Sequence, residues 1–365
     1  MEIVKDHGDW LAEYKALREN AGVLDLSFRS RICLVGNDRV RFLHGQVTND
    51  VKKLSVGEGC YAAITTAKGK MESDLNIFNL PDELLLDFEP GLTEKIARRL
   101  EKFIVADDVQ IVDAAPHYGL LSVQGPEAEN VVRSLNLFPE IPAQQLGSVK
   151  ISDAAFGEIY LANNSRLLNF CRSRGNETQI EKKSKTPHGI SYNSGFDLFV
   201  PNNSLVAVAD KLITAAKSFD GRAAGWMAFE IARIENGIPR FGADMNETNL
   251  PLECGIENRA ISFNKGCYIG QEIINRVHSF GHVTRELRGL RLADDLKILP
   301  QKNDKLFRDG KEIGCITSAV KSPVLNANIA LGYVRREANQ IGNELKLRTA
   351  TGESSARIVE LPFVK

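Results

Sequence analysis

The residues whose types and spacing could carry chemistry in this chain lie in the segment Asn264–His278, NKGCYIGQEIINRVH. Cys267 stands between a lysine-glycine pair that begins at Lys265 and an aromatic residue, Tyr268. A nearby cation, or the N-terminus of a short helix formed by the following residues, lowers the pKa of a thiol. A partly ionised thiol is a nucleophile, a redox-sensitive group and a soft metal ligand. We therefore expect Cys267 to be a reactive or metal-contacting thiol, with a buried packing role as the ordinary alternative.

Two further segments bring acids onto predicted strands. In TTAKGKMESDLNIFN, a glycine turn delivers Ser73 and Asp74 onto a strand. In SGFDLFV, Asp197 is the only acid of an apolar strand. Asp197 can face solvent, which is the commoner arrangement in an alternating strand, or face a pocket and accept hydrogen bonds from a heterocycle rich in N–H groups.

The segment GWMAFEIARIENGIPRFGADMNE gathers acidic and basic residues around a predicted amphipathic helix, Trp226–Glu235. A turn-rich stretch follows this helix. Arg233, Glu235, Arg240 and Asp244 could fix a polar ligand, or these groups could pair with each other.

The elements that must position these residues mix helices and strands along the whole chain. Apolar residues at helical spacing predict helices, and alternating apolar and polar residues predict strands. The predicted helices cover residues 9–22, 38–45, 91–105, 205–219 and 226–235, and the predicted strands include 30–36, a meander over 61–90, a hairpin over 157–170, and 195–201. This mixture, without a GxGxxG or Walker A sequence, favours an α+β architecture with no nucleotide-phosphate cradle.

From Leu287 onward the sequence predicts a small all-β domain. Short apolar runs there are separated by Gly, Asp and Asn, and Asp309-Gly310 is a strong hairpin signal. The boundary falls near Arg285, immediately after the segment that carries Cys267. Ligand clefts tend to form at such domain junctions.

Composition limits the classes of function. The 365 residues are 43% hydrophobic and 25% charged, as in folded soluble proteins, and this length predicts two or three domains. The net charge of −1 gives no general attraction to nucleic acid, and only the loop Arg172–Lys185 offers a local basic patch. No apolar run reaches the length of a membrane span. The start MEIVKDHGDW resembles neither a signal peptide nor a transit sequence, so we expect a cytoplasmic protein, or a mitochondrial matrix protein whose presequence has been removed.

The cysteines and histidines favour neither a disulfide framework nor a metal site. The six cysteines lie far apart, without a CxxC pair. Only His278 and His282 have i, i+4 spacing among the six histidines, and Phe280 and Gly281 between them argue against a continuous helix. We interpret this pair as exposed polar residues and expect no metal site.

Five segments together resemble a known family. KGCYIGQE at Lys265–Glu272 is similar to the signature of the YgfZ-type folate-binding proteins, which are relatives of the glycine-cleavage aminomethyltransferases, or T-proteins. The resemblance continues through LHGQVTNDV, AKGKMESDL, GFDL and RIENGIPRFGADM, in family order along the chain. The strand-rich C-terminal part also fits the last domain of this family.

This resemblance implies a three-domain cloverleaf of the aminomethyltransferase type, with two interleaved α+β lobes and a small C-terminal β-barrel. Residues 1–45 and 116–225 would form the first lobe, 46–115 and 226–284 the second lobe, and 285–365 the barrel. Tetrahydrofolate, or a one-carbon derivative of it, would bind in the central hole where the three parts meet.

The resemblance also assigns roles to individual residues. Asp197 lies where the aminomethyltransferases carry a glutamate that grips the pterin, whose guanidine-like edge one carboxylate can hold with two parallel hydrogen bonds. Arg233 corresponds to an arginine that contacts the ligand or braces the pocket. Ser73, Asp74 and Tyr268 would complete the cofactor site.

Ser73 decides whether aminomethyl transfer is expected. The aminomethyltransferases carry two adjacent aspartates here, the first of which is essential, and GKMESDL places Ser73 first and Asp74 second. Serine cannot carry the negative charge that would stabilise an iminium-like methylene transfer. We therefore expect no aminomethyltransferase activity. Cys267 then stays as the reactive group, and Lys265 is either a cation beside it or a rim cation for the folate tail.

The function that the resemblance implies is a tetrahydrofolate-binding accessory protein for assembly or repair of iron–sulfur clusters, in enzymes such as those that methylthiolate tRNA. Its partners would be iron–sulfur enzymes or assembly factors, in transient contact because the chain shows no cluster-binding set of cysteines. We expect a monomer that binds neither membranes nor, directly, nucleic acid. The alternatives are a folate-dependent one-carbon transferase and a noncatalytic scaffold whose folate pocket is vestigial.

Overall fold

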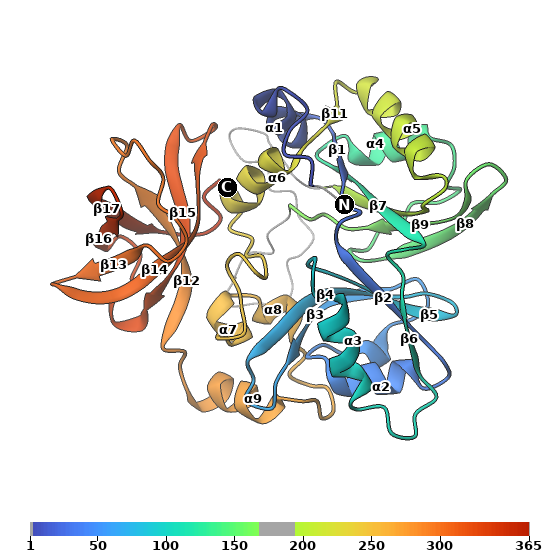
Figure 1. Cartoon of the computed structure of the whole chain (residues 1–365), viewed down its shortest axis with the longest axis horizontal. Helices are drawn as coiled ribbons and strands as arrows, with labels where there is room; N and C mark the ends of the chain where they lie inside the picture. The colour runs from blue at the N-terminus through green and yellow to red at the C-terminus, as the bar shows by residue number, and fades with distance from the viewer. Residues whose placement is uncertain (1–2, 168–193, 365) are drawn as a thin grey trace.

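The computed structural model describes residues 3–167 and 194–364, and it shows an α+β protein made of two sheet-rich lobes and a closed β-barrel (Figure 1). The fold class predicted from the sequence is therefore confirmed. The basic loop Arg172–Lys185, considered above as a local patch for nucleic acid, lies outside the described residues.

The first lobe is a six-stranded sheet with helices on one face. In spatial order its strands are β11 (Arg222–Ala223), β1 (Gly22–Asp25), β7 (Tyr118–Gln124), β10 (Gly195–Pro201), β9 (Gly157–Asn163) and β8 (Ser148–Asp153). Neighbours are antiparallel except β1 and β11, which are parallel. Helices α4 (Ala128–Ser134) and α5 (Leu205–Lys217) cover the sheet, because their buried residues share one apolar core with β7 and β10.

The second lobe is a five-stranded antiparallel sheet. In spatial order its strands are β3 (Gly59–Thr65), β4 (Met71–Asn79), β5 (Glu83–Phe88), β2 (Ser30–Val35) and β6 (Gln110–Asp113). Helices α2 (Arg39–Gln46) and α3 (Thr93–Glu101) and the short 3-10 helix η1 (Val51–Lys53) contribute to the core of this lobe, where Ile32, Leu43 and Ile96 are fully buried.

The two sheets pack on each other through their remaining faces. Leu24 and Phe199 from the first lobe and Phe78 from the second belong to one buried cluster, and the Phe78 and Phe199 rings meet edge to face at 5.5 Å. Helix α1 (Trp10–Glu19) and helix α6 (Trp226–Glu235) add residues to the same cluster. This apolar contact fixes the orientation of one lobe against the other.

The barrel is closed by six strands and begins at Arg285. Around the barrel the order is β12 (Arg285–Leu292), β15 (Ala327–Arg335), β14 (Lys311–Ser322), β13 (Lys305–Arg308), β16 (Glu344–Thr349) and β17 (Gly352–Val359), and the 3-10 helix η2 (Arg336–Ala338) follows β15. Helices α7 (Pro251–Cys254), α8 (Glu257–Ala260) and α9 (Gln271–Phe280) lie between the second lobe and the barrel (Figure 1). Their buried residues share a core with β12 and β15.

Strand pairing sets where the chain passes from one sheet to the other. The expected boundary at residue 45 placed β1 and β2 in one lobe, and in the structure β2 pairs with β5 and β6 of the second sheet, so the chain crosses between residues 26 and 29. The hairpin predicted over 157–170 extends into residues 168–170, which lie outside the described residues, and within the described part β9 pairs with β8 and β10. Both β2 and β9 are apolar segments whose sequence does not specify a partner.

Candidate functional site

Asp197 lies at the centre of β10, fully buried, and holds an arginine rather than solvent. Its Oδ2 accepts hydrogen bonds from Nη2 of Arg166 at 2.6 Å and from the Asn164 amide at 2.7 Å, and its Oδ1 accepts from Nε of Arg166 at 3.0 Å. The sequence left open whether Asp197 faces solvent or the interior, and in the structure its side chain is buried. The guanidinium of Arg166 occupies the two-pronged position that the resemblance assigned to a pterin edge.

Arg166 also connects the two lobes. Its Nη2 donates to Oδ2 of Asp87 on β5 at 2.9 Å, and Oδ1 of Asp87 accepts from Nε of Arg29 at 2.8 Å. Arg29 in turn bonds Glu89 at 2.7 Å. Burial opposes the ionisation of Asp87, but the guanidinium groups of Arg29 and Arg166 outweigh it and lower the pKa of this carboxyl.

The same chain of ion pairs continues to the barrel. Arg240 bonds Glu89 at 2.8 Å and Glu230 at 3.2 Å. Arg233, which is 1% exposed, bonds Glu230 at 2.7 Å and Asp244 at 2.5 Å. Asp244 also accepts hydrogen bonds from Thr317 at 2.5 Å and Ser318 at 2.7 Å, both on β14.

These contacts define what we call the central ion-pair network, which joins both lobes, helix α6 and the barrel. Its charged members among the described residues are Arg29, Asp87, Glu89, Arg166, Asp197, Glu230, Arg233, Arg240 and Asp244. The network thus contains five carboxylates and four guanidinium groups. Of the two arrangements considered for these residues, the structure shows ion pairing for Arg233, Arg240 and Asp244 within the network. Among the described residues, Glu235 does not join them and instead pairs with Arg18 at 2.9 Å.

An aromatic wall stands beside this network. The Arg240 guanidinium lies 5.0 Å from the centre of the Trp226 ring, and Phe28 contacts Trp226 edge to face at 5.3 Å. A cation over an indole ring is a favourable arrangement. The network therefore borders an apolar surface of the kind that an aromatic ligand ring would contact.

Ser73 and Asp74 project from opposite faces of β4. Ser73 pairs in register with Ile64, a member of the core formed with α2 and α3, and its Oγ donates to the carbonyl of Asp74 at 2.9 Å. Asp74 shares its face with Asn76, which donates to Asp87 at 3.2 Å. The aspartate on the side of the network is therefore Asp74, and Ser73 belongs to the lobe core.

Asp74 has the features of a functional carboxyl. Its Oδ2 accepts a hydrogen bond from the Tyr61 hydroxyl at 2.7 Å, and its Oδ1 is buried without a hydrogen-bond partner among the described residues. Burial, reinforced by the charge of Glu89, raises the pKa of Asp74. An orphaned acceptor of this kind requires an explanation such as a ligand or an ordered water molecule.

The Cys267 loop differs from its sequence interpretation in the role of the lysine. Cys267 is exposed, but the Lys265 side chain is buried, and its Nζ donates to the carbonyls of His44 at 2.5 Å, Val47 at 2.8 Å and Asn49 at 2.8 Å. Burial lowers the pKa of Lys265 to about 8. Lys265 is therefore not a rim cation for a ligand tail, because its ammonium ties the loop to the residues that follow α2.

Tyr268 and Gly270 shape the same loop. Tyr268 is 7% exposed, Lys265 Nζ lies 5.0 Å from the centre of its ring, and its hydroxyl has no hydrogen-bond partner among the described residues. Gly270 has a φ of +89°, and a Cβ there would lie 2.6 Å from the carbonyl oxygen of Thr66. Only glycine fits this position, and α9 begins immediately after it, as the sequence predicted.

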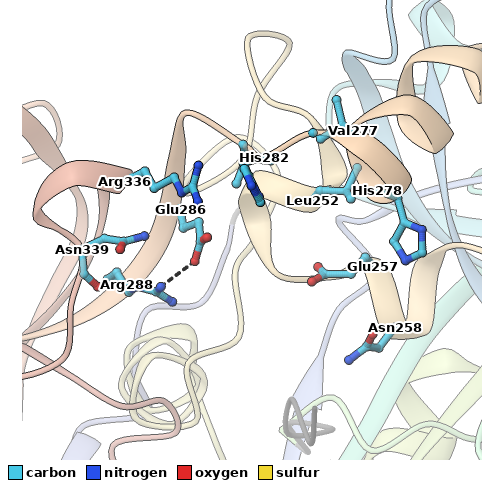
Figure 2. Close-up of a pocket in the computed structure, with 12 residues that line it drawn as sticks. Leu252, Glu257, Asn258, Val277, His278, His282, Glu286, Arg288, Arg336 and Asn339 are labelled. Carbon is cyan, nitrogen blue, oxygen red and sulfur yellow. Dashed lines mark hydrogen bonds and ion pairs between the residues drawn. The ribbon is translucent and has the colours of Figure 1, made fainter. Parts of the chain in front are cut away.

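No hydrogen bond or ion pair among the described residues joins Cys267 to the central ion-pair network. A cavity of about 600 Å³ lies elsewhere, between α7, α8, α9 and the barrel (Figure 2). Its lining residues are Leu252, Glu257, Asn258, Val277, His278, Gly281, His282, Val283, Glu286, Arg288, Arg336 and Asn339. Neither Cys267 nor Asp197 lines this cavity, and neither lines a second, much smaller cavity beside Trp226.

His278 and His282 both line the larger cavity, and α9 ends at Phe280 between them. His278 stacks on the Phe263 ring at 3.9 Å. In residues 3–167 and 194–364, no three His, Cys, Asp or Glu side chains come together as a group that could hold a metal ion. Among the same residues, no helix combines the length and apolar character needed to cross a membrane.

Sequence reasoning missed Arg166, Arg29 and Asp87, which hold the centre of the network. One signal for Asp87 was present, because it is an acid that follows three leucines in the strand ELLLDF, much as Asp197 lies among apolar residues in GFDLFV. No comparable signal marked the two arginines, since their partners are 31 to 79 residues away in the chain.

Two interleaved α+β lobes and a six-stranded barrel, joined by a buried polar centre, define the class of fold. Residues 5–167 and 169–265 match the family described as the GCVT N-terminal domain, and residues 285–365 match the glycine cleavage T-protein C-terminal barrel domain. The chain therefore belongs to the glycine cleavage T-protein family.

Individual relatives agree with this assignment. The chain is 26% identical over 356 residues to an aminomethyltransferase of Thermoanaerobacter pseudethanolicus, covering 97% of this chain and 89% of that protein. It is 28% identical over 355 residues to an aminomethyltransferase of Lysinibacillus sphaericus, with the same coverage. The crystal structure of the glycine cleavage system aminomethyltransferase T from Bartonella henselae shares the fold, with a TM-score of 0.79 at 20% identity over 99% of this chain and 91% of that one.

Proposed function

We propose that this chain is a tetrahydrofolate-binding accessory protein of the YgfZ type, which supports assembly or repair of iron–sulfur clusters in client enzymes. The folate would bind at the central ion-pair network, and Cys267 would act on the client. Enzymes that methylthiolate tRNA are candidate clients. The observation that carries the proposal is the two-pronged grip of Asp197 on a guanidinium.

The residues of the network fit a reduced pteridine. The amino-pyrimidine edge of a pterin presents N–H donors in the same fork as a guanidinium, so it can replace Arg166 on Asp197 without a change in hydrogen-bond pattern. The Oδ1 atom of Asp74 is a second acceptor, buried and without a partner among the described residues. Trp226 offers the aromatic surface for the ring system.

The acceptors of the network favour the same ligand chemistry. Among the described residues, Asp197 accepts hydrogen bonds from N–H groups, so a ligand that donates N–H groups is complementary to it. Burial disfavours the charged form of Asp74 and raises its pKa. Ser73, in the lobe core, would take no direct part.

Cys267 would supply the contact with the client enzyme, because its thiol is exposed while Lys265 holds the loop rigidly. The described residues hold no cluster-binding set of ligands, so cluster contact would be transient and shared with the client. We propose a monomer that works in the cytoplasm or the mitochondrial matrix, with no direct role for nucleic acid.

Titration with tetrahydrofolate tests the folate part. Quenching of tryptophan fluorescence and a rise in melting temperature should report binding to the wild-type protein. Asp197→Asn keeps the size of the side chain but presents an N–H group to the donor edge, so affinity should fall at least about tenfold. Glu353→Gln, on an exposed barrel hairpin, is the matched control. Unchanged affinity in Asp197→Asn would refute the site.

Complementation tests the accessory role. A strain deficient in this protein is supplied with the wild type or with Cys267→Ala, and methylthiolated tRNA is measured. Loss of rescue with Cys267→Ala, at equal protein level, is the expected result. Equal rescue would reduce the thiol to a surface residue and remove it from the proposed function.

A second candidate function is folate-dependent aminomethyl transfer, which the position of Asp74 favours. The carboxyl on the network side of β4 is Asp74, so the serine at position 73 removes no charge from that side. Formation of methylene-tetrahydrofolate from an aminomethyl donor, lost in Asp74→Asn, would establish this activity. Absence of turnover in a protein that binds tetrahydrofolate would favour the accessory role.

A further inference from the structure

The cavity between α7, α8, α9 and the barrel has no part in the proposed function (Figure 2). Its volume of about 600 Å³ lies within the range of small-molecule sites, which is about 300–1,000 Å³. The cavity also lies where helices of one domain meet the next domain, a common position for ligand sites. A ligand in this cavity would touch neither Asp197 nor Cys267, because neither residue lines it.

The barrel side of the cavity presents a cation. Arg336, in η2, extends from this side toward His282 (Figure 2). The backbone amide of Arg336 donates to the carbonyl of Thr284 at 3.0 Å, which ties η2 to the segment that carries His282. Neither the guanidinium of Arg336 nor the imidazole of His282 has a hydrogen bond or an ion pair with the described residues. Both groups can therefore donate N–H bonds to a carboxylate that enters the cavity.

The other arginine on the barrel side is already neutralised. Arg288 forms an ion pair with Glu286 at 2.5 Å, and its Nε donates to the carbonyl of Asn339 at 3.2 Å (Figure 2). The Arg288 side chain is 23% exposed and that of Glu286 is 16% exposed. Because these two opposite charges lie together, the cation that an entering ligand meets on this side is Arg336.

The helix side of the cavity is acidic and apolar. Glu257, the first residue of α8, directs its carboxylate toward the barrel (Figure 2). Leu252 of α7, Val277 of α9 and Val283 add apolar surface to the lining. The cavity thus has a guanidinium on one side, a carboxylate on the other, and apolar side chains as part of its wall. Charges arranged in this way are complementary to a ligand that carries the opposite charge at each of its ends.

We propose that this cavity binds a small zwitterion of the amino acid or short peptide type. The ligand carboxylate lies on Arg336 and His282, and the ligand ammonium faces Glu257. An apolar side chain of the ligand packs on Leu252 and Val277. A ligand with only one of the two charges is bound less well, because it leaves the other charged wall of the cavity desolvated and without a partner.

Calorimetric titration of the full-length protein with L-leucine and with glycyl-L-leucine tests the ligand class. At least one of the two zwitterions should bind with a dissociation constant of about 1 mM or lower. Tighter binding of L-leucine would identify free amino acids as the ligands, and tighter binding of the dipeptide would identify peptide ends. If neither compound bound at concentrations up to about 10 mM, the proposal would be overturned.

Blocked ligands test the two charges on the unaltered protein, so no variant has to fold. The zwitterion that binds more tightly is compared with its N-acetylated form, which lacks the ammonium, and with its C-terminal amide, which lacks the carboxylate. Each blocked form should bind at least about tenfold more weakly. Equal binding of either blocked form would refute the arrangement of charges proposed for the site.

Two substitutions locate the site on the chain. Arg336→Gln and Glu257→Gln should each weaken binding of the zwitterion about tenfold. Arg336→Gln should also abolish the preference for the zwitterion over its amide, an effect that general destabilisation would not produce. Arg335→Gln is the matched control, because Arg335 is exposed and does not line the cavity. Unchanged affinity in Arg336→Gln would overturn the proposal, and neither folate nor a client enters these measurements, so their outcome is independent of the proposed function.

Discussion

The central ion-pair network and the Cys267 loop handle buried charge in opposite ways. In the network, guanidinium and carboxylate groups from three parts of the fold neutralise one another. In the loop, the buried ammonium of Lys265 is satisfied by three backbone carbonyls, and among the described residues it forms no ion pair. A ligand can enter the network only by exchanging partners, whereas the loop keeps its lysine on backbone carbonyls and leaves the thiol of Cys267 exposed.

Because of this difference, the stability of the protein should respond differently to substitutions in the two regions. Breaking one partner of a buried ion pair leaves an uncompensated charge, which costs more than the pair contributed. Removing an exposed side chain from a rigid loop costs little. Substitutions in the two regions should therefore separate stability from reactivity.

The largest effect is expected from Asp87→Ala. The change leaves Arg29 and Arg166 without their shared carboxylate in a buried site, so the free energy of unfolding should fall by about 3–5 kcal/mol. Urea denaturation measures it, with Glu353→Ala on the exposed barrel hairpin as the control that should not change. A loss no larger than that of the control would show that the network does not hold the lobes together.

Acidification should act on the same network. The pKa of Asp87 in the folded protein is below its unfolded value of about 3.9, so its contribution is complete above that value and is lost as pH falls through and below it. Asp74, whose pKa is raised, opposes this trend. Wild-type stability should drop as the pH falls below about 4, and urea denaturation at several pH values should show a flatter profile for Asp87→Asn. Parallel profiles would exclude Asp87 as the source.

A smaller loss is expected when the loop is released. Lys265→Met removes the donor to three buried carbonyls while keeping much of the side-chain volume, so stability should fall by about 1–3 kcal/mol. Lys53→Met, whose ammonium is exposed beside Asp50, is the matched lysine control. Thermal unfolding of the two variants gives the comparison. Equal values would mean that the carbonyls find other donors.

The smallest effect is expected at the thiol. Cys267→Ala should change stability by less than about 0.5 kcal/mol, because the side chain is exposed. Cys254→Ala is the contrasting cysteine, since this thiol is 2% exposed and lies 3.1 Å from the Tyr333 hydroxyl. Denaturation of both variants should rank Cys254→Ala as the more destabilised. The reverse order would place Cys267 in a packing role.

Much of the fold followed from sequence periodicity. The helix predicted over 226–235 matches α6 in both limits, and the first strand of the barrel begins at Arg285. Partner choice did not follow, because β2 and β9 are apolar runs that could pair with several strands. Pairing is decided by tertiary packing, which a single sequence does not contain.

The residues of the candidate site also divide into those that the sequence indicated and those that it did not. Asp197 could be singled out because an acid in an apolar strand is locally anomalous. The burial of Lys265 could not, since the carbonyls that receive its ammonium lie 216 to 221 residues earlier in the chain. Likewise the opposite faces of Ser73 and Asp74 became visible only once β4 had a register against β3. The sequence indicated the local chemistry of these residues but not the partners that lie far away in the chain.

The early crossing of the chain from β1 to β2 has a consequence for biosynthesis. The five-stranded sheet is contained in residues 30–113, whereas the six-stranded sheet needs β1 near residue 22 and β11 at 222–223. A nascent chain can therefore complete the second sheet on the ribosome while β1 is the one strand of the six-stranded sheet already synthesised. The Cys267 loop, which contacts the end of α2 through Lys265, emerges only after both sheets are synthesised.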